Sequence, residues 1–262
     1  MRRVVGSSKV SIRQEIVVRT QRIGIVEEER RLSSSSEAAE RPLGIVARGL
    51  TKSFDGGLVH ALRGTDLEIQ PGERIAITGP TGCGKSTLLS ILALLERQDG
   101  GELIVGGRPA EGIRSPERWR GRHLGIVFQF HHLLPHLTVE ENVMLPLVGV
   151  GARSTDARRR ARSILRDIGL AHRARFVAEK LSGGERQMTA VARALAGSPG
   201  LILADEPTGN VDSKAGDRVL ELLFGRRGNR PATVVVVTHN DRVAGDADRI
   251  LRMRDGRIDG RG

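Results

Sequence analysis

The chain has little of what would place it outside the cell or inside a membrane. Cys83 is its only cysteine, which excludes an internal disulfide and a cysteine-rich metal cluster and fits a reducing compartment. It has no apolar run of about 18 residues, so the sequence predicts no membrane-spanning helix. The basic start, MRRVVGSSKV, has no apolar stretch after it, so we expect no secretory signal peptide.

Aromatic residues are also scarce, at 2% of the chain, with one Trp and no Tyr. A net charge of +11 would suggest a nucleic-acid partner, but base-stacking side chains are too few for that reading to be favoured. We therefore expect no nucleic-acid binding. The Arg-rich stretch at 158–162 is interpreted as a solvated helix face, with an anionic membrane surface as the lesser alternative.

The composition changes near residue 43. Residues 1–42 mix charges with a serine run, and we expect a disordered extension there. A start codon placed too far upstream and a regulatory arm are the alternatives. Beyond it, apolar runs alternate with helical patterns, which indicates an α/β fold with a mainly parallel sheet. Strands are predicted at 44–50, 66–70, 74–78, 102–105, 125–128, 201–205 and 233–238, and helices at about 85–95, 156–169, 185–196 and 214–224.

Residues 74–92, RIAITGPTGCGKSTLLSIL, predict a strand, a glycine-rich turn and a helix. The turn matches G-x-x-x-x-G-K-S, in which backbone N–H groups and the positive end of the helix surround phosphate oxygens. We predict that Lys85 contacts the β- and γ-phosphates and that Ser86 ligates Mg²⁺. Cys83 is interpreted as a small residue that fits the turn. The predicted nucleotide-binding loop is Gly79, Pro80, Thr81, Gly82, Cys83, Gly84, Lys85, Ser86 and Thr87.

Two further patterns narrow the class of nucleotide-binding protein. LSGGERQ, at 181–187, combines a helix-capping serine with two glycines that let a second phosphate come close. LILADEP, at 201–207, is an apolar strand that ends in two acids. Asp205 is predicted to face the Mg²⁺ side of the loop. Glu206 is predicted to orient and deprotonate a water molecule for attack on the γ-phosphate, so ATP hydrolysis is the expected chemistry.

The order of these motifs resembles that of the ABC-transporter ATPase family over about residues 44–258. The chain also carries Gln129 in VFQF, Val211 and Asp212 in EPTGNVD, and His239 in VVVVTHN. The resemblance implies a P-loop NTPase (RecA-like) core, an antiparallel β subdomain and an inserted helical subdomain at about 130–190. FQFHHLLP, EPTGN and HALRGTDLEI are similar to the lipoprotein-releasing and macrolide-exporter branch.

The resemblance also implies roles around the bound nucleotide. Phe54, in LTKSF, would stack on the adenine, where the family more often has Tyr. Gln129 would contact Mg²⁺ or the attacking water, and His239 would contact the γ-phosphate. Together with the acids after the strand, this gives a catalytic set of Glu206, His239 and Gln129, and a metal set of Ser86, Gln129 and Asp205.

One phosphate loop and one signature in each chain imply a composite site. Two copies would meet head to tail and trap ATP between them. Permease subunits in the membrane would dock beside Gln129 and residues 130–150, where three histidines are interpreted as docking-loop residues and not as a metal site: His131, His132 and His136. The residues that reach the other copy would be Ser182, Gly183, Gly184 and Gln187, with Asp212 at the subunit boundary.

Two departures from the family pattern follow the signature. Met188 stands where the family usually has Arg, and Thr189 where it usually has Val, which leaves the effect on activity open. The expected function is that of an ATPase at the cytoplasmic face of the inner membrane, powering export or extraction through a separate permease. A cell-division-type regulator of cell-envelope enzymes and an importer ATPase are the alternatives. The transported substrate is not encoded in these motifs.

Overall fold

The computed structural model describes residues 41–209, 211–225 and 232–259. The chain divides into two units, residues 1–38 and 39–262, and every described residue belongs to the second unit. Of the extension expected over residues 1–42, only Arg41 and Pro42 are described, and the rest lies outside the described residues.

The larger sheet carries the strands that end at the candidate site. Its order is β10-β9-β3-β8-β7-β6, in which the strands from β9 to β6 run parallel and β10 pairs antiparallel to β9. All five residues of β8 are buried, as is required of a parallel strand that is covered on both faces. The bounds are β3 (Arg74–Thr78), β6 (Leu124–Val127), β7 (Leu201–Asp205), β8 (Thr233–Val237), β9 (Arg249–Arg254) and β10 (Arg257–Asp259).

The smaller sheet is antiparallel, in the order β2-β1-β4-β5. The strands predicted at 44–50 and 66–70 are the outer parts of a long hairpin whose turn lies at Asp55–Gly57. The bounds are β1 (Ile45–Phe54), β2 (Val59–Ile69), β4 (Gly100–Val105) and β5 (Arg108–Pro109). The predicted fold class, a mainly parallel core with an antiparallel β subdomain, is confirmed.

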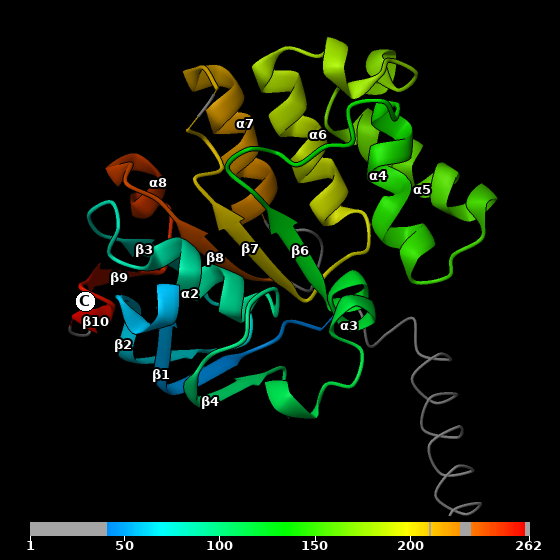
Figure 1. The fold of residues 1–262 in the computed structure, drawn as a ribbon. Coiled ribbons are helices and arrows are strands. Elements are labelled where there is room, and N and C mark those ends of the chain that lie inside the picture. The colour runs from blue at the N-terminus through cyan, green and yellow to red at the C-terminus, as the bar shows by residue number, and fades with distance from the viewer. Residues whose placement is uncertain (1–40, 210, 226–231, 260–262) are drawn as a thin grey trace, which may run out of the picture. The chain divides into compact units, whose positions relative to one another are not determined.

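Helices cover one face of the larger sheet, and a further helix together with the smaller sheet covers the other face (Figure 1). Successive residues of β7 point to opposite faces. Ile202 and Ala204 therefore join the core that contains α4 to α7, whereas Leu201 and Leu203 join the core that contains α2 and the smaller sheet. The helices are α2 (Lys85–Leu92), α3 (Pro116–His123), α4 (Val139–Gly149), α5 (Ser154–Asp167), α6 (Gly183–Leu195), α7 (Ser213–Phe224) and α8 (Asp241–Gly245).

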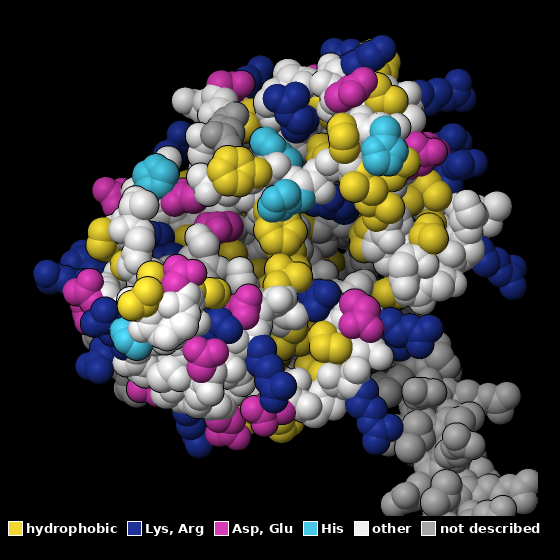
Figure 2. Space-filling model, in the orientation of Figure 1, with side chains coloured by type: hydrophobic (Ala, Val, Ile, Leu, Met, Phe, Trp, Pro, Cys, Tyr) yellow, Lys and Arg dark blue, Asp and Glu magenta, His cyan; other side chains and the backbone are white. Residues whose placement is uncertain are grey.

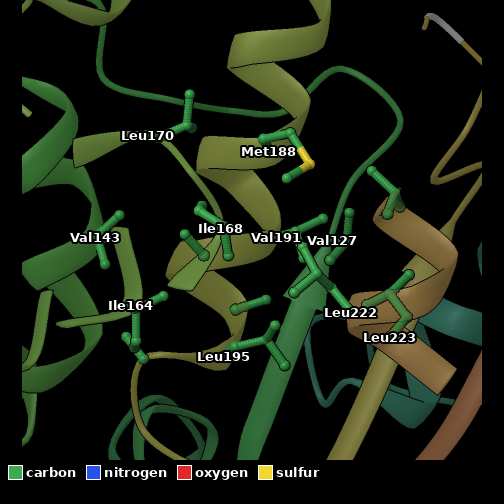
Figure 3. Close-up of a cluster of buried hydrophobic side chains, with 14 of the residues drawn as sticks. Val127, Val143, Ile164, Ile168, Leu170, Met188, Val191, Leu195, Leu222 and Leu223 are labelled. Atoms are coloured by element: carbon green, nitrogen blue, oxygen red, sulfur yellow. The ribbon is translucent and has the colours of Figure 1, made fainter. Parts of the chain in front are cut away.

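Between β6 and β7 the chain is helical and has its own aliphatic contacts (Figure 3). Val143 of α4 and Ile164 of α5 pack in the same cluster as Val191 of α6. Met188 belongs to this cluster and is 7% exposed, so α6 forms with Met where the family usually has Arg. Thr189 is fully buried and donates its hydroxyl to the Glu185 carbonyl at 2.7 Å.

Several elements were not predicted, because their sequences lack the expected period. The helix α3, PERWRGRH, buries no residue and so has no apolar face. In β9, RILRMR, arginines alternate with the buried Leu251 and Met253, which hides a short strand in a basic stretch. Among the described helices, none combines the length and the apolar character that a membrane crossing requires.

Candidate active site

The phosphate-binding loop joins the C-terminal end of β3 to the first residue of α2. Its glycines are required by close approach as well as by conformation. Gly79 has a φ of 150°, and a Cβ atom there would lie 2.1 Å from the Met253 carbonyl oxygen. Gly84 has a φ of 103°, and its Cβ would lie 2.3 Å from the Ala61 carbonyl oxygen. No other residue fits at either position without moving the backbone.

Lys85 lies across its own loop. Its Nζ donates to the carbonyl oxygens of Gly79 at 2.7 Å and Pro80 at 2.9 Å, and lies 3.8 Å from the Cys83 sulfur. The thiol itself is 5% exposed. The ammonium group is therefore held inside the ring of backbone groups that would surround a phosphate, where it can exchange these carbonyls for phosphate oxygens.

Ser86 and Asp205 meet at the start of α2 and the end of β7. The Ser86 hydroxyl donates to the Asp205 carboxylate. Burial raises the pKa of Asp205 above its usual value, and the neighbouring Glu206 charge adds to this, while Ser86 and Lys85 oppose it. A partly buried carboxylate and a hydroxyl side by side are oxygen donors of the kind that a hard divalent cation prefers.

Glu206 is the next residue along the chain and has a φ of 44°, which is unusual for a residue other than glycine. Its Oε1 lies 2.7 Å from His239 Nδ1, and its Oε2 accepts a hydrogen bond from the Thr238 hydroxyl at 3.2 Å. The Glu206 side chain is 12% exposed, and that of His239 is 75% exposed. Because β7 and β8 are parallel neighbours, both residues follow the same edge of the sheet.

The signature begins α6 and is organised by a capping box. The Ser182 hydroxyl accepts from the Glu185 N–H at 3.3 Å, and the Glu185 carboxylate accepts from the Ser182 N–H at 2.9 Å. The same carboxylate accepts from Arg173 Nε at 2.6 Å. The Ser182 backbone bond, followed by those from the Ser182 hydroxyl and Arg173, lowers the pKa of Glu185. Ser182 is exposed, and the two glycines after it are half-buried in the first turn of α6, where the backbone N–H groups have no carbonyl partner within the helix.

Gln187 is the member of the predicted signature set that points inward. Its side chain is 2% exposed and donates to the Pro207 carbonyl at 2.6 Å. It thus ties α6 to the loop that follows Glu206. Within residues 41–209, 211–225 and 232–259, no hydrogen bond or ion pair joins Ser182, Gly183 or Gly184 to the phosphate loop, so one chain presents the two phosphate-binding elements separately.

The remaining predicted residues flank these elements. Phe54 ends β1, is 38% exposed and has the Lys52 ammonium 5.3 Å from its ring centroid. Gln129 is exposed and follows β6. Asp212 is the N-cap of α7 and accepts from the Ala215 N–H at 3.0 Å. Exposed hydrophobic residues follow Gln129, and Figure 2 shows hydrophobic and histidine side chains gathered on one face.

Sequence reasoning missed residues that act through others. Thr238 holds Glu206 and was visible only as part of VVVVTHN. Arg173 holds Glu185 across 12 residues and had no motif to mark it. Arg193 binds two carbonyls more than 60 residues away. Side chains that act through tertiary contacts have no short-range spacing, so no sequence pattern marks the two arginines.

The arrangement of loop, acids and capped helix defines a nucleoside-triphosphate hydrolase, and residues 62–209 match the family model described as ABC transporter. The chain belongs to this family and is an ATP-binding, ATP-hydrolysing subunit of an ABC transporter.

The relatives span most of the chain. It is 46% identical over 213 residues to the lipoprotein-releasing system ATP-binding protein LolD of Geobacter metallireducens, covering 80% of this chain and 95% of that protein. The LolD of Porphyromonas gingivalis is 44% identical, with 81% and 97% covered. Among solved structures, the dimeric ATP-binding cassette MJ0796 with ADP and Pi has a TM-score of 0.78 at 35% identity, covering 83% of this chain and 97% of that chain.

Proposed function

We propose that two copies of this chain hydrolyse ATP at composite sites and thereby drive a membrane permease that releases lipoproteins from the membrane. The lipoprotein substrate is supported by the relatives at 46% and 44% identity, which are named for a lipoprotein-releasing system. The pairing is supported by the dimeric cassettes of the same fold. The chain would act at the cytoplasmic face of the inner membrane, where its permease lies.

The observation that carries the hydrolytic role is the placement of Glu206. Its carboxylate is fixed by Thr238 and faces His239, at the sheet edge where the phosphate loop also ends. A γ-phosphate held by Lys85 would lie along this edge, and a water beside it would lose its proton to Glu206. The exposed His239 would turn to the γ-phosphate, which releases the Glu206 oxygen for the water.

Mg²⁺ fits the residues present. Ser86 and Asp205 supply adjacent oxygens, and the exposed Gln129 would supply an amide oxygen from the next loop. When bound, the ion would neutralise charge on the β- and γ-phosphates. Asp205 holds its position through Ser86 before the ion arrives.

The signature would complete the site of the other copy. Ser182 and the two glycines after it stand at the start of α6, where the positive end of the helix favours an anion. Among the described residues no hydrogen bond or ion pair joins them to the phosphate loop of the same chain, so a second copy would supply the phosphate that they bind. Asp212, at the start of α7, would lie along the boundary between copies. The face near Gln129 would receive the permease.

The test of the hydrolytic role is Glu206→Gln. The amide keeps the shape of the side chain but accepts no proton, so we expect phosphate release to fall by about 100-fold or more. ATP-dependent pairing, measured by size-exclusion chromatography, should persist because the contacts to the γ-phosphate remain. Glu117→Gln, on the exposed α3, is the matched control and should leave the rate unchanged. A Glu206 variant with near-normal turnover would exclude this residue as the base.

The cargo is tested separately, with the permease and this chain in vesicles that carry a lipoprotein. ATP should release the lipoprotein in the wild type and not in the Glu206→Gln variant. ATP hydrolysis without release of lipoprotein would retain the ATPase and reject the proposed cargo.

A further inference from the structure

The loop after Gln129 contains two consecutive left-handed residues. His131 has a φ of 62° and His132 a φ of 46°, and neither is glycine. Such conformations are strained for residues other than glycine and persist only where the surroundings impose them. Local hydrogen bonds close the turn, from the His131 N–H to the Phe128 carbonyl at 3.0 Å and from the His132 N–H to the Phe130 carbonyl at 2.6 Å.

The side chain that holds this turn from outside is Arg193. Its Nη2 donates to the His131 carbonyl and its Nη1 to the His132 carbonyl, both at 2.6 Å. The histidine rings contribute less. The Nε2 atom of His131 is buried without a hydrogen-bond partner, and the His132 ring packs edge-on against Phe128 with 4.8 Å between centroids. The two-pronged guanidinium matches two carbonyls at the spacing of one peptide.

Arg193 is half-buried, and the two carbonyls are the hydrogen-bond acceptors that its guanidinium has among the described residues. Within the part of the chain that the structure describes, no ion pair involves its guanidinium. Burial alone lowers the pKa of Arg193, with no carboxylate acting in the opposite direction. Removing a cation from water is costly unless hydrogen bonds replace the lost hydration. The two carbonyls therefore stabilise the charge as much as the charge stabilises the turn.

The position of Arg193 on α6 links three loops. This helix begins at Ser182, ties Gln187 to the Pro207 carbonyl beyond Glu206, and reaches the loop after Gln129 through Arg193 near its last turn. A helix of this length is a rigid rod of about 20 Å. A displacement of the Gln129 loop would therefore be transmitted along α6 to the signature, and a displacement of the signature to this loop.

We propose that Arg193 is a positioning residue for ATP hydrolysis, which fastens the Gln129 loop to α6 so that this loop and the signature move as one body. The inference rests on the proposed roles of Gln129 and Ser182. It concerns the coupling of the two loops and adds no contact to ATP.

The test compares Arg193→Lys and Arg193→Gln with Arg160→Gln. Lys keeps the positive charge but cannot donate to both carbonyls with two nitrogens in a fixed plane. Arg160 also serves α6, bonding the Ala196 carbonyl and the Ser198 hydroxyl, but does not touch the Gln129 loop. With the permease present, we expect kcat to fall about tenfold in both Arg193 variants while KM for ATP stays within twofold. The Arg160 variant should keep the wild-type kcat.

Rescue separates positioning from general stability. Glycine adopts the left-handed turn without strain. Adding His131→Gly and His132→Gly to the Arg193→Gln variant should therefore raise its kcat by at least threefold. Unchanged kcat in both Arg193 variants would overturn the inference. The inference would also be overturned if KM for ATP changed along with kcat, or if the Arg193 variants failed to fold, and the two glycines did not reverse the effect.

A further arm separates the two proposals. Gln129→Ala should lower kcat in a chain that retains Arg193. If it has no effect, the proposed role of Gln129 fails. If it lowers kcat but the Arg193 variants do not, the role of Gln129 stands and the inference about Arg193 fails.

Discussion

At the scale of single residues, each charged group of the candidate site has a hydrogen-bond partner within the chain. Lys85 binds two carbonyls of its own loop, Asp205 accepts from Ser86, and Glu206 faces His239. Each of these contacts uses an atom that the proposed reaction needs. Nucleotide binding must therefore exchange internal bonds for bonds to phosphate, which lowers the net affinity for nucleotide and favours release of the product.

Asp205 offers a test of the conflict between stability and function. Its pKa is raised from 3.8 by burial, so the folded chain binds this proton more tightly than the unfolded chain does. Ionised Asp205 therefore destabilises the folded state at neutral pH, and this penalty disappears as the pH falls to about 4. We expect Asp205→Asn to raise the melting temperature at pH 7 by about 2 °C and to abolish hydrolysis.

Thermal unfolding without nucleotide or Mg²⁺ measures this effect, and the gap between the two proteins should close near pH 4. An Asn variant less stable than the wild type at pH 7 would show that the Ser86 and Lys85 contacts outweigh the burial of the carboxylate.

Residues within short motifs could be predicted, because a loop and a helix start are local structures. The phosphate loop, Ser182 and the acids after LILA all depend on spacing within a few residues. His239 was placed by the family resemblance, and its contact with Glu206 spans 33 residues. Arg193 reaches across 61 and 62 residues to backbone atoms, whose identity no side chain encodes.

At the scale of elements, one acid joins two helices of the stretch between β6 and β7. Glu140 of α4 is 7% exposed and pairs with Arg158 at 2.9 Å and Arg162 at 2.6 Å, which stand one turn apart on α5. The hydrogen bond that Arg162 donates to Glu140 raises the pKa of Arg162. Part of the basic face at 158–162 is thus an internal clamp and not solely a solvated surface.

This clamp predicts unequal effects of its members. Glu140→Ala leaves both arginines without their acid, and we expect the melting temperature to fall by about 2–4 °C. Arg158→Gln leaves the ion pair between Glu140 and Arg162 in place and should lower the melting temperature by less than about 1 °C. Scanning calorimetry at low salt measures both. Equal effects of the two substitutions would mean that the clamp does not stabilise these helices.

Element types followed from the sequence where burial imposes a period. All of β8 is buried and was predicted as a strand, and α6 and α7 were predicted to within a few residues. The helix α4, VEENVMLPLVG, was not placed, because its buried residues include Glu140 and Asn142. Asn142 bonds the backbone at Leu134, Leu137 and Thr138, so a polar side chain occupies a core position by serving the preceding loop.

At the scale of the whole molecule, the separation of the two phosphate-binding elements predicts complementation. Lys85→Ala damages the loop, and Ser182→Arg blocks the signature. Each protein alone should lack activity. In an equal mixture, mixed pairs combine the intact loop of one copy with the intact signature of the other, so about a quarter of the wild-type rate should return if the two sites act independently.

Phosphate release by the mixture, at protein concentrations that support pairing, measures the effect. A mixture of wild type with Glu206→Gln provides the reference: wild-type pairs alone give about a quarter of the full rate, and activity above that level comes from pairs with one working site. If the mixture of the two damaged proteins stays as inactive as either protein alone while that reference is active, the sites are not shared between copies.

The contact between Glu206 and His239 has a consequence for an unpaired copy. While the imidazole lies against the Glu206 carboxylate, this oxygen is not available to take a proton from water, so we expect an unpaired copy to hydrolyse ATP slowly. ATP hydrolysis would then begin only when a second copy and the γ-phosphate draw the His239 imidazole away from Glu206. Copies without a permease to drive would therefore consume little ATP.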